Sequence, residues 1–221
     1  GVWVVSVVRD GEGFLLRAAD GRSWRARAVI SATGTYSRPF VPAYPGAGGF
    51  RGRQLHSAAY RGPSDFEGGR LVVVGGANSG AQIAADLARP LADSGGALIW
   101  CTTGPPRFLP DDVDGRELFR VANAAIRGVG DSGGIADLGD IVAVPPVREA
   151  RDAGLLTATP MFERFNADGV EWADGRREPV DTVIWCTGFR PALGHLRGLL
   201  PRRDGRVVTR GVEVPGVPGY V

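Results

Sequence analysis

The sequence contains no lysine, and it has only two cysteines and two histidines in 221 residues. No C-x-x-C pair is present, so the chain itself carries no redox dithiol of that spacing. Cys101 and Cys186 each end an apolar run, which favours buried, reduced thiols and a cytoplasmic setting. We predict no metal site.

Long apolar runs and clustered charges are also missing. No apolar stretch approaches the roughly 20 residues that a membrane-spanning helix needs, so we expect no membrane span. The formal net charge is +2, and the arginines are scattered rather than gathered into a basic run. Nucleic acid is therefore not expected as a partner. A hydrophobic fraction of 43% is sufficient for the core of a soluble globular protein.

The first and last residues also lack the features of an ordinary domain end. There is no initiator methionine, and the strand-like run 2–8 begins at once. The chain stops at 217–221 as another apolar run begins. We expect a fragment cut at both ends, with a mature processed chain as the alternative.

The first forty residues have the pattern of a β-meander. Strand-like runs at 2–9, 13–19 and 23–31 are separated by Asp-Gly turns, a strong hairpin signal. The last run leads into a predicted strand over 28–34 with a glycine exit. Residues 35–70 are rich in proline, glycine and aromatic side chains, which indicates an ordered connection.

The middle of the chain has the pattern of a βαβ unit. Residues 70–75 read as a buried parallel strand, 79–89 as a helix that Pro90 stops, and 97–101 as the next strand. The elements expected after them are a helix over 115–127, a short strand over 141–144 ending at Pro145-Pro146, a second meander within 155–178 and a final buried strand over 180–186.

A glycine-rich turn joins the first strand of this unit to its helix. It comprises Gly75, Gly76, Ala77, Asn78, Ser79 and Gly80. Gly75 permits the tight turn, Gly80 lets the helix approach the strand, and the amide groups at the helix start suit a pyrophosphate. Ala77 replaces the middle glycine of the dinucleotide fingerprint, where a methyl group crowds the phosphate. The alternative is a tight turn without a ligand.

The second strand of the unit bears on which dinucleotide would bind. An NAD site usually has an acidic residue at the end of this strand, but the strand ends here in Cys101-Thr102-Thr103-Gly104. NADP requires a nearby arginine, and Arg107 is the first one available. A surface role for Arg107 remains the alternative.

Two strand ends share one plan along the chain. Thr33-Gly34 and Thr187-Gly188 each follow an apolar strand and precede an aromatic residue, an arginine and a proline. The last strand of a doubly wound domain can end beside its cofactor, where glycine allows close approach. Two such ends predict two dinucleotide domains, unless the match between two common glycine turns is a coincidence.

Between these features lies a segment from Phe50 to Tyr60 that contains His56. By chemistry alone, His56 is a candidate proton donor, a hydrogen-bond anchor for a moving domain, or a loop histidine with satisfied hydrogen bonds.

Together these motifs resemble the flavin-containing monooxygenase family. Phe50, Gly52, His56 and Tyr60 match the family's FxGxxxHxxxY/F segment, residues 42–46 match its P-x-x-P-G, and the two Thr-Gly ends match its ATG-type motifs. The resemblance implies that NADPH reduces FAD and that the reduced flavin uses O₂ to oxygenate a soft nucleophile or a carbonyl compound. It also implies that Asn78 and Ser79 lie near the nicotinamide–flavin contact and His56 near the domain junction.

The resemblance completes the prediction of fold and site. We expect an α/β protein in which a Rossmann-like NAD(P)-binding domain with a β-meander is inserted in a partial FAD-binding domain. The predicted parts are a remnant of the FAD-binding domain (1–40), a connection (41–69), the NAD(P)-binding domain (70–190) and a return to the FAD-binding domain (191–221). The cofactor-binding candidates are Thr33, Gly34, His56, Tyr60, Gly75, Gly76, Ala77, Asn78, Ser79, Gly80, Arg107, Thr187 and Gly188; no catalytic residue is assigned.

Three departures from the family pattern leave other functions open. The FAD fingerprint is missing, so the chain alone should bind FAD poorly; Ala77 replaces a glycine; and Thr103-Gly104 stand where relatives often have arginine. One alternative is a flavin disulfide reductase, or another NAD(P)H reductase, of the same two-domain plan. The other is a non-catalytic nucleotide-binding module that senses or regulates.

Overall fold

A computed structural model describes residues 1–113, 140–203 and 206–221. The chain forms two compact units. Unit 1 contains the described residues of 1–38 and 189–221, and unit 2 contains those of 39–188. The helix predicted over 115–127 lies outside the described residues.

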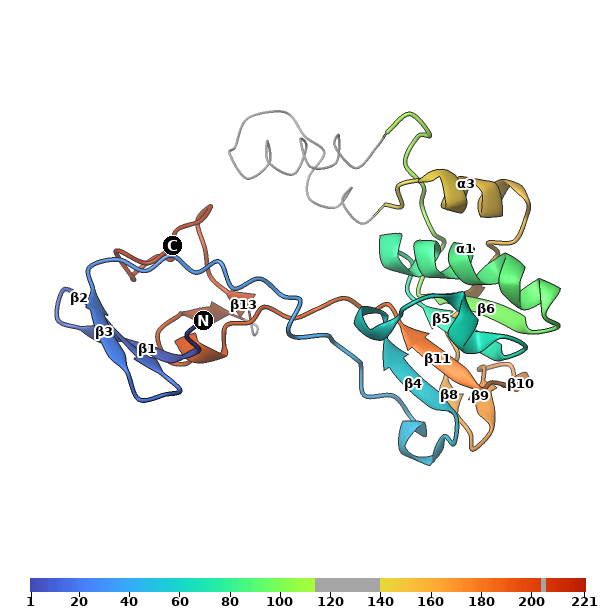
Figure 1. Cartoon of the computed structure of the whole chain (residues 1–221), viewed down its shortest axis with the longest axis horizontal. Helices are drawn as coiled ribbons and strands as arrows, with labels where there is room; N and C mark the ends of the chain where they lie inside the picture. Colours follow the sequence, from blue (N-terminus) through green and yellow to red (C-terminus); the bar gives the residue numbers. More distant parts are fainter. Residues whose placement is uncertain (114–139, 204–205) are drawn as a thin grey trace. The chain divides into compact units, whose positions relative to one another are not determined.

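Unit 2 is built on a five-stranded parallel sheet, with strand order β4-β11-β5-β6-β7 (Figure 1). The strands are β4 (Arg53–His56), β5 (Arg70–Val74), β6 (Ala97–Thr102), β7 (Ala158–Pro160) and β11 (Thr182–Trp185). β5 lies in the middle and is completely paired on both sides, which explains its continuous run of buried side chains. The predicted α/β fold with a Rossmann-like parallel sheet is confirmed.

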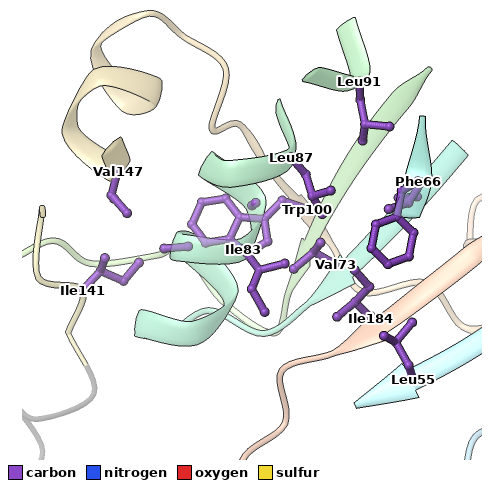
Figure 2. Packing of buried hydrophobic residues seen from close by; sticks show 13 residues of the cluster. Leu55, Phe66, Val73, Ile83, Leu87, Leu91, Trp100, Ile141, Val147 and Ile184 are labelled. Atoms are coloured by element: carbon purple, nitrogen blue, oxygen red, sulfur yellow. The ribbon is translucent and has the colours of Figure 1, made fainter. Parts of the chain in front are cut away.

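Helices α1 (Asn78–Asp93) and α3 (Pro145–Asp152) pack against one another beside one face of this sheet (Figure 1). Alternate strand residues point to that face, because successive side chains of a strand point to opposite sides. They form a buried cluster with the apolar side of α1, which includes Val73, Ile83, Leu87, Trp100 and Ile184 (Figure 2). The predicted βαβ unit is present, and its helix is amphipathic as expected.

The opposite face of the sheet carries an aromatic cluster. Three short antiparallel strands lie there, β8 (Arg164–Phe165), β9 (Gly169–Glu171) and β10 (Arg177–Pro179). Phe162, Phe165 and Trp172 pack with Val72 and Trp185 of the sheet. The second meander expected within 155–178 is confirmed for these three strands.

Unit 1 contains the predicted first meander. Strands β1 (Val4–Asp10), β2 (Gly13–Ala18) and β3 (Ser23–Ala26) pair antiparallel in sequence order. A short pair, β12 (Arg202–Arg203) and β13 (Arg206–Val207), lies in the second segment of the unit. A single buried cluster joins the two segments; it consists of Val7, Phe14, Leu196, Leu200, Val214, Val217 and Tyr220.

The predicted end of the first helix is wrong, because α1 continues through Pro90 to Asp93. Leu91, beyond the proline, is only 2% exposed and belongs to the buried cluster, so tertiary packing outweighs the local cost of proline. The Ser94 hydroxyl donates to the Pro90 carbonyl (2.7 Å), and the Gly96 amide donates to the Leu91 carbonyl (2.7 Å). These bonds satisfy carbonyl groups of the last helical turn, and the helix ends at Asp93 rather than before Pro90.

The short strand predicted over 141–144 is also wrong. Ile141 forms only an isolated bridge with Phe108, and Pro145-Pro146 begin α3 rather than close a strand. Proline is tolerated in the first turn of a helix, where its missing N–H would have no helical partner. Buried Val147 and Ala150 lie three residues apart on this short helix.

A strand predicted over 28–34 is reduced to one parallel bridge between Val29 and Tyr220. The Val29 and Ser31 amides donate to the Gly219 and Val221 carbonyls, at 2.8 and 2.7 Å. Ile30 is 80% exposed. Within the described residues, the backbone partners of this segment are residues 219–221 and, at Gly34, Ala192. These few bonds form no continuous ladder, so the segment is extended but is not a strand.

Two further segments join the parallel sheet unexpectedly. β7, within the predicted second meander, pairs with β6, and β4, within the predicted connection 41–69, pairs with β11. No helix among the described residues is long and apolar enough to cross a membrane.

Candidate functional site

The turn between β5 and α1 is held by backbone and indole hydrogen bonds. Gly75 has φ 139°, and a Cβ atom at this residue would lie 2.5 Å from the Cys186 carbonyl oxygen. The Gly75 amide donates to the Cys101 carbonyl (2.9 Å), and the Trp100 indole N–H donates to the Gly75 carbonyl (2.8 Å). The turn is therefore fixed by both neighbouring strands and tolerates only glycine at residue 75.

Gly80 brings the first turn of α1 against this backbone. A Cβ atom at Gly80 would lie 1.9 Å from the Gly75 carbonyl oxygen, a distance that real atoms do not show. The predicted reason for glycine at this residue, close approach of helix and strand, matches the geometry.

In the part of the chain that the structure describes, no side chain caps the N-terminal end of α1, and Gly76, Ala77 and Ser79 are exposed. Ala77 has φ −115° and ψ −173°, an ordinary extended conformation, and its methyl group is not buried in the turn. The first amide groups of a helix have no helical acceptor and lie at the positive end of its dipole, so this end suits an anion.

Asn78, the first helical residue, ties the helix start to a distant segment. Its side-chain amide donates to the Asp140 carbonyl (3.3 Å) and its side-chain oxygen accepts from the Val142 amide (2.8 Å). Ile141, between them, is fully buried in the cluster beneath α1 (Figure 2). The amide of Asn78 is thus occupied within the protein, and the proximity of Asn78 and Ser79 to nicotinamide stays a prediction.

Arg107 forms an ion pair with Asp140, the residue whose carbonyl binds Asn78. Its Nε donates to Asp140 Oδ1 at 2.9 Å, and its Nη2 lies 2.8 Å from the same oxygen. Its carbonyl accepts from the Ile141 amide at 2.7 Å. Arg107 and Asn78 therefore both contact Asp140, although they lie 29 positions apart in the sequence.

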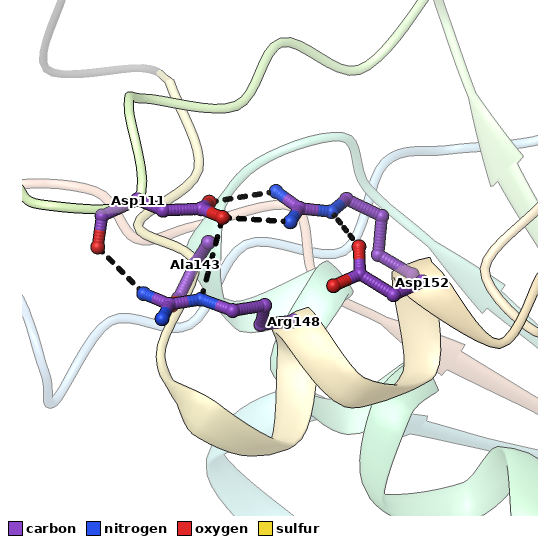
Figure 3. Close-up of polar contacts among 5 residues, drawn as sticks. Asp111, Ala143, Arg148 and Asp152 are labelled. Carbon is purple, nitrogen blue, oxygen red and sulfur yellow. Dashed lines mark hydrogen bonds and ion pairs between the residues drawn. The ribbon is translucent and has the colours of Figure 1, made fainter.

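The segment that carries Arg107 is anchored to α3 by an ion-pair network (Figure 3). Arg151 binds both oxygens of the Asp111 carboxylate, at 2.9 and 3.0 Å, and also pairs with Asp152. Arg148 donates to the Asp111 carbonyl at 2.6 Å. Hydrogen bonding to Arg151 lowers the pKa of Asp111. This network joins Asp111, four residues after Arg107, to α3.

Thr102 ends β6 beside the glycine turn. It is buried, and a Cβ atom at Gly76 would lie 3.4 Å from its side chain. The next two residues, Thr103 and Gly104, are exposed and carry no charge. No acidic residue and no arginine stands directly at this strand end.

The four fixed residues of the FxGxxxHxxxY segment all make contacts within unit 2. Phe50 lies in the aromatic cluster, and a Cβ atom at Gly52 would meet its ring and the Asp181 carbonyl. His56 is 7% exposed; its Nδ1 accepts from the Ala58 amide (3.1 Å), and its Nε2 lies 2.8 Å from the Gly188 carbonyl. This pairing assigns the proton to Nε2. Both ring nitrogens are thus paired within unit 2, as expected for a histidine with satisfied hydrogen bonds, and the proton-donor and domain-anchor roles stay predictions.

Tyr60 packs over α1 rather than at its start. Its hydroxyl donates to Asp86 Oδ2 at 2.6 Å, and its ring stacks on Phe66 at 5.9 Å between centroids. Burial, followed by the hydrogen bond to Asp86, raises the pKa of Tyr60 above its usual value. A role of His56 or Tyr60 in cofactor binding remains a prediction.

The second Thr-Gly end lies in unit 2. The Thr187 hydroxyl donates to the Phe40 carbonyl, and the Gly188 carbonyl accepts from the Phe40 amide (3.0 Å) as well as from His56. Gly188 has φ 72°, which favours glycine.

The first Thr-Gly end lies in unit 1 and makes similar contacts. The Thr33 hydroxyl donates to the Ala192 carbonyl (3.2 Å), and the Gly34 carbonyl accepts from the Ala192 amide (3.0 Å). Thr33 also lines a cavity of about 680 Å³, together with Trp3, Arg38 and His195. Burial lowers the pKa of His195, which lines this cavity.

Both cysteines are unpaired; Cys101 is buried as expected, whereas Cys186 is half-buried. Cys101 is buried on β6 and Cys186 follows β11, so β5 lies between them. Two strand spacings amount to roughly 9–10 Å, beyond the reach of a disulfide. Burial raises the pKa of both thiols to about 12, so neither is a ready thiolate. Among the described residues, no cluster of metal-binding side chains exists.

Sequence reasoning did not find Asp140, Trp100 or the Asp111–Arg151 pair. Each acts through a partner remote in sequence: Asp140 lies 62 residues from Asn78, and Trp100 lies 25 residues from Gly75. The one available signal was Asp140 directly before the apolar run 141–144, which marks it as the start of an ordered segment.

The residues present fit a nicotinamide dinucleotide but provide only part of a flavin site. Gly80 packs the helix on the turn, and the uncapped N-terminus of α1 leaves amide donors for a pyrophosphate. The sequence has one such glycine turn, so it offers no second cradle of this kind for the pyrophosphate of FAD.

Comparisons with other proteins support this interpretation. The family model of the pyridine nucleotide-disulphide oxidoreductases matches residues 2–96, from the first meander through α1. A flavin-containing monooxygenase from Stenotrophomonas maltophilia superposes with a TM-score of 0.83 at 44% identity, covering 99% of this chain and 60% of that one.

Curated relatives agree with the structural match. An uncharacterized CzcO-like oxidoreductase of Geobacillus kaustophilus is 27% identical over 219 residues, 95% of this chain and 60% of its own length. The indole-3-pyruvate monooxygenase YUCCA4 of Oryza sativa subsp. japonica is 27% identical over 218 residues, 85% of this chain and 48% of its own length. The resemblance predicted from the motifs is confirmed, and the chain spans about half to three fifths of these relatives.

Proposed function

Because the chain is flavin-containing-monooxygenase-like, we propose that it is the central part of an FAD- and NADPH-dependent oxidoreductase of the monooxygenase type. Unit 2 binds the nicotinamide dinucleotide, and unit 1 belongs to the flavin-binding domain. The substrates are O₂ and a small soft nucleophile or carbonyl compound. We also propose the cytoplasm as its location, on the basis of the two unpaired thiols.

One observation carries the proposal: the glycine turn after β5 is fixed on both sides and leaves the start of α1 uncapped. Backbone amides at residues 77–80 hold the pyrophosphate, and Gly80 keeps the helix close enough for them to converge. When bound, the flavin supplies the oxygen chemistry. The chain's own residues bind and orient the nicotinamide dinucleotide, and the buried strands exclude water from beneath the turn.

The domain division expected from the sequence becomes a proposal with one refinement. The two Thr-Gly ends lie near the unit boundaries at 38/39 and 188/189. β4, which lies within the expected connection, is part of the sheet of unit 2. Its last residue, His56, is hydrogen-bonded to the Gly188 carbonyl. We propose that the connection serves as one wall of the dinucleotide-binding unit.

The flavin disulfide reductase receives no support from the cysteines. Its chemistry needs two thiols that form a disulfide, and Cys101 and Cys186 stand on either side of β5 with raised pKa values. The non-catalytic module remains the second candidate. It is favoured by Ala77 in place of glycine, and it predicts dinucleotide binding without turnover.

Two measurements test the proposal. Calorimetric titration of the chain with NADPH should show one site per chain, whereas FAD should bind weakly or not at all. The protein extended by its flanking coding sequence should carry a flavin absorption spectrum and oxidise NADPH while consuming O₂. Absence of NADPH binding to the chain would remove the dinucleotide site. Binding without any NADPH oxidation in the flavin-loaded protein would favour the module.

A further inference from the structure

The Arg107–Asp140 ion pair stands next to the proposed pyrophosphate turn. Asn78, the first residue of α1, binds the backbone carbonyl of Asp140, while the Asp140 carboxylate binds Arg107. The Asp140 side chain is 17% exposed, and that of Arg107 is 66% exposed. The carboxylate is therefore held in the fold, and the guanidinium remains accessible.

The end of β6 carries none of the charges that usually choose between the two nicotinamide dinucleotides. In a Rossmann unit, an acidic residue there binds the ribose hydroxyls of NAD, and an arginine nearby accommodates the 2′-phosphate of NADP. Thr102 is buried against Gly76, and Thr103 and Gly104 are uncharged. These three residues therefore provide no charge that distinguishes NADP from NAD.

We propose that Arg107 and Asp140 together set the cofactor preference: Arg107 binds the 2′-phosphate, and Asp140 holds Arg107 in place and competes for it. This inference rests on the proposed function of unit 2. Both contacts of Arg107 with Asp140 go to one oxygen, Oδ1, through Nε and Nη2. A guanidinium has five N–H donors, so a phosphate can be bound beside the carboxylate or in its place.

The arrangement has a physical consequence for affinity. A phosphate carries more negative charge than a carboxylate and accepts bidentate hydrogen bonds from arginine. Asp140 weakens that attraction by partly neutralising Arg107, and its negative charge repels a phosphate that binds the same guanidinium. The affinity for NADPH is therefore lower than Arg107 alone would give. The affinity for NADH, which has no 2′-phosphate, is nearly unaffected by Arg107 and Asp140.

The test compares 2′,5′-ADP with 5′-AMP, two fragments that differ by the 2′-phosphate alone. Calorimetry at constant low salt is performed on the whole chain and on Arg107→Gln, Asp140→Asn and the double variant. Arg107→Gln should lower 2′,5′-ADP affinity about tenfold or more, because hydrogen bonds to charged groups are the strong ones. Asp140→Asn should raise it about two- to fivefold, the range of a mostly exposed ion pair. The double variant should match Arg107→Gln, and 5′-AMP affinity should change less than twofold throughout.

A matched ion pair in unit 2 provides the control. Arg177 and Glu171, on β10 and β9, are 2.9 Å apart with exposures of 69% and 22%, close to those of Arg107 and Asp140. Arg177→Gln and Glu171→Gln remove the same kinds of charge, one positive and one negative, on the face of the sheet opposite to α1. They should leave the affinity ratio of the two fragments unaltered. Arg107→Lys, which keeps the charge but loses the planar fork, should retain part of the preference for 2′,5′-ADP.

The outcomes separate this inference from the proposed function. If the unaltered chain binds neither fragment nor NADPH, the dinucleotide site itself is absent. If it binds both fragments and Arg107→Gln weakens them equally, or leaves 2′,5′-ADP unchanged, the role of Arg107 is overturned while the site stands. If Asp140→Asn lowers the 2′,5′-ADP affinity with an unchanged thermal midpoint, the competing role of Asp140 is wrong.

Discussion

Unit 2 and unit 1 bury their large apolar side chains to very different extents. Unit 2 has a central parallel sheet with one buried cluster on each face, and its Trp100 and Trp185 are almost completely buried. Unit 1 has one cluster, and Trp3, Ile30 and Tyr36 are 74%, 80% and 72% exposed. In unit 2 the ligand turn follows a central strand that is paired on both sides, in a sheet covered on both faces, whereas the three-stranded meander of unit 1 buries fewer side chains.

The difference also appears at the two Thr-Gly ends. In unit 2 the preceding strand, β11, is paired on both sides, by β4 and β5. In unit 1 the equivalent segment, 28–34, has one bridge. The same local sequence plan therefore gives a buried strand in one unit and an exposed, extended segment in the other, because lateral partners rather than local propensity create a strand.

The largest expected effect is a difference in stability when one tryptophan is replaced in each unit. Trp100→Ala removes a buried ring and the indole hydrogen bond to Gly75, and should lower the free energy of unfolding of unit 2 by about 3–5 kcal/mol. Trp3→Ala, at an exposed residue, should change stability by less than about 0.5 kcal/mol. Hydrogen exchange followed separately in each unit measures the two stability changes. Equal losses of stability in the two variants would show that the difference in burial does not produce a difference in stability.

A second comparison separates two glycines of the same turn. Gly80→Ala places a methyl group against the Gly75 carbonyl and should cost about 1–3 kcal/mol and abolish detectable NADPH binding. Gly76→Ala meets only the Thr102 side chain at 3.4 Å, so stability should change by less than about 1 kcal/mol. Urea unfolding and NADPH titration measure the pair. Intact NADPH binding by Gly80→Ala would contradict the close approach that the site requires.

A third comparison concerns pH, and it also belongs to unit 2, which holds both cysteines. Burial raises the pKa of Cys101 from 9.0 to about 12, so the neutral thiol is favoured by folding. Its contribution to stability is complete below pH 9 and is lost as the pH rises toward 12. The free energy of unfolding should fall over this range, and Cys101→Ala should reduce the slope. If this variant leaves the pH dependence of the free energy of unfolding unchanged, another group causes the loss of stability at high pH, for example Tyr60, whose pKa is also raised.

The sequence by itself determined the features whose residues lie close together along the chain. Glycine spacing after an apolar run predicted the β5–α1 turn, and Asp-Gly turns predicted the first meander, because backbone conformation at these points is a local property. The motif from Phe50 to Tyr60, combined with the glycine turn, the P-x-x-P-G and the two Thr-Gly ends, indicated the flavin-containing monooxygenase resemblance.

Only the tertiary structure decided which distant residues meet. Burial of Leu91 carries α1 past Pro90, lateral pairing makes β4 part of the sheet, and Asp140 joins Asn78 to Arg107. None of these contacts leaves a periodic signal, since each depends on how chain segments tens of residues apart cross in space. The free energy of packing and of long-range hydrogen bonds outweighs local preference there, and that balance does not show in any short window of sequence.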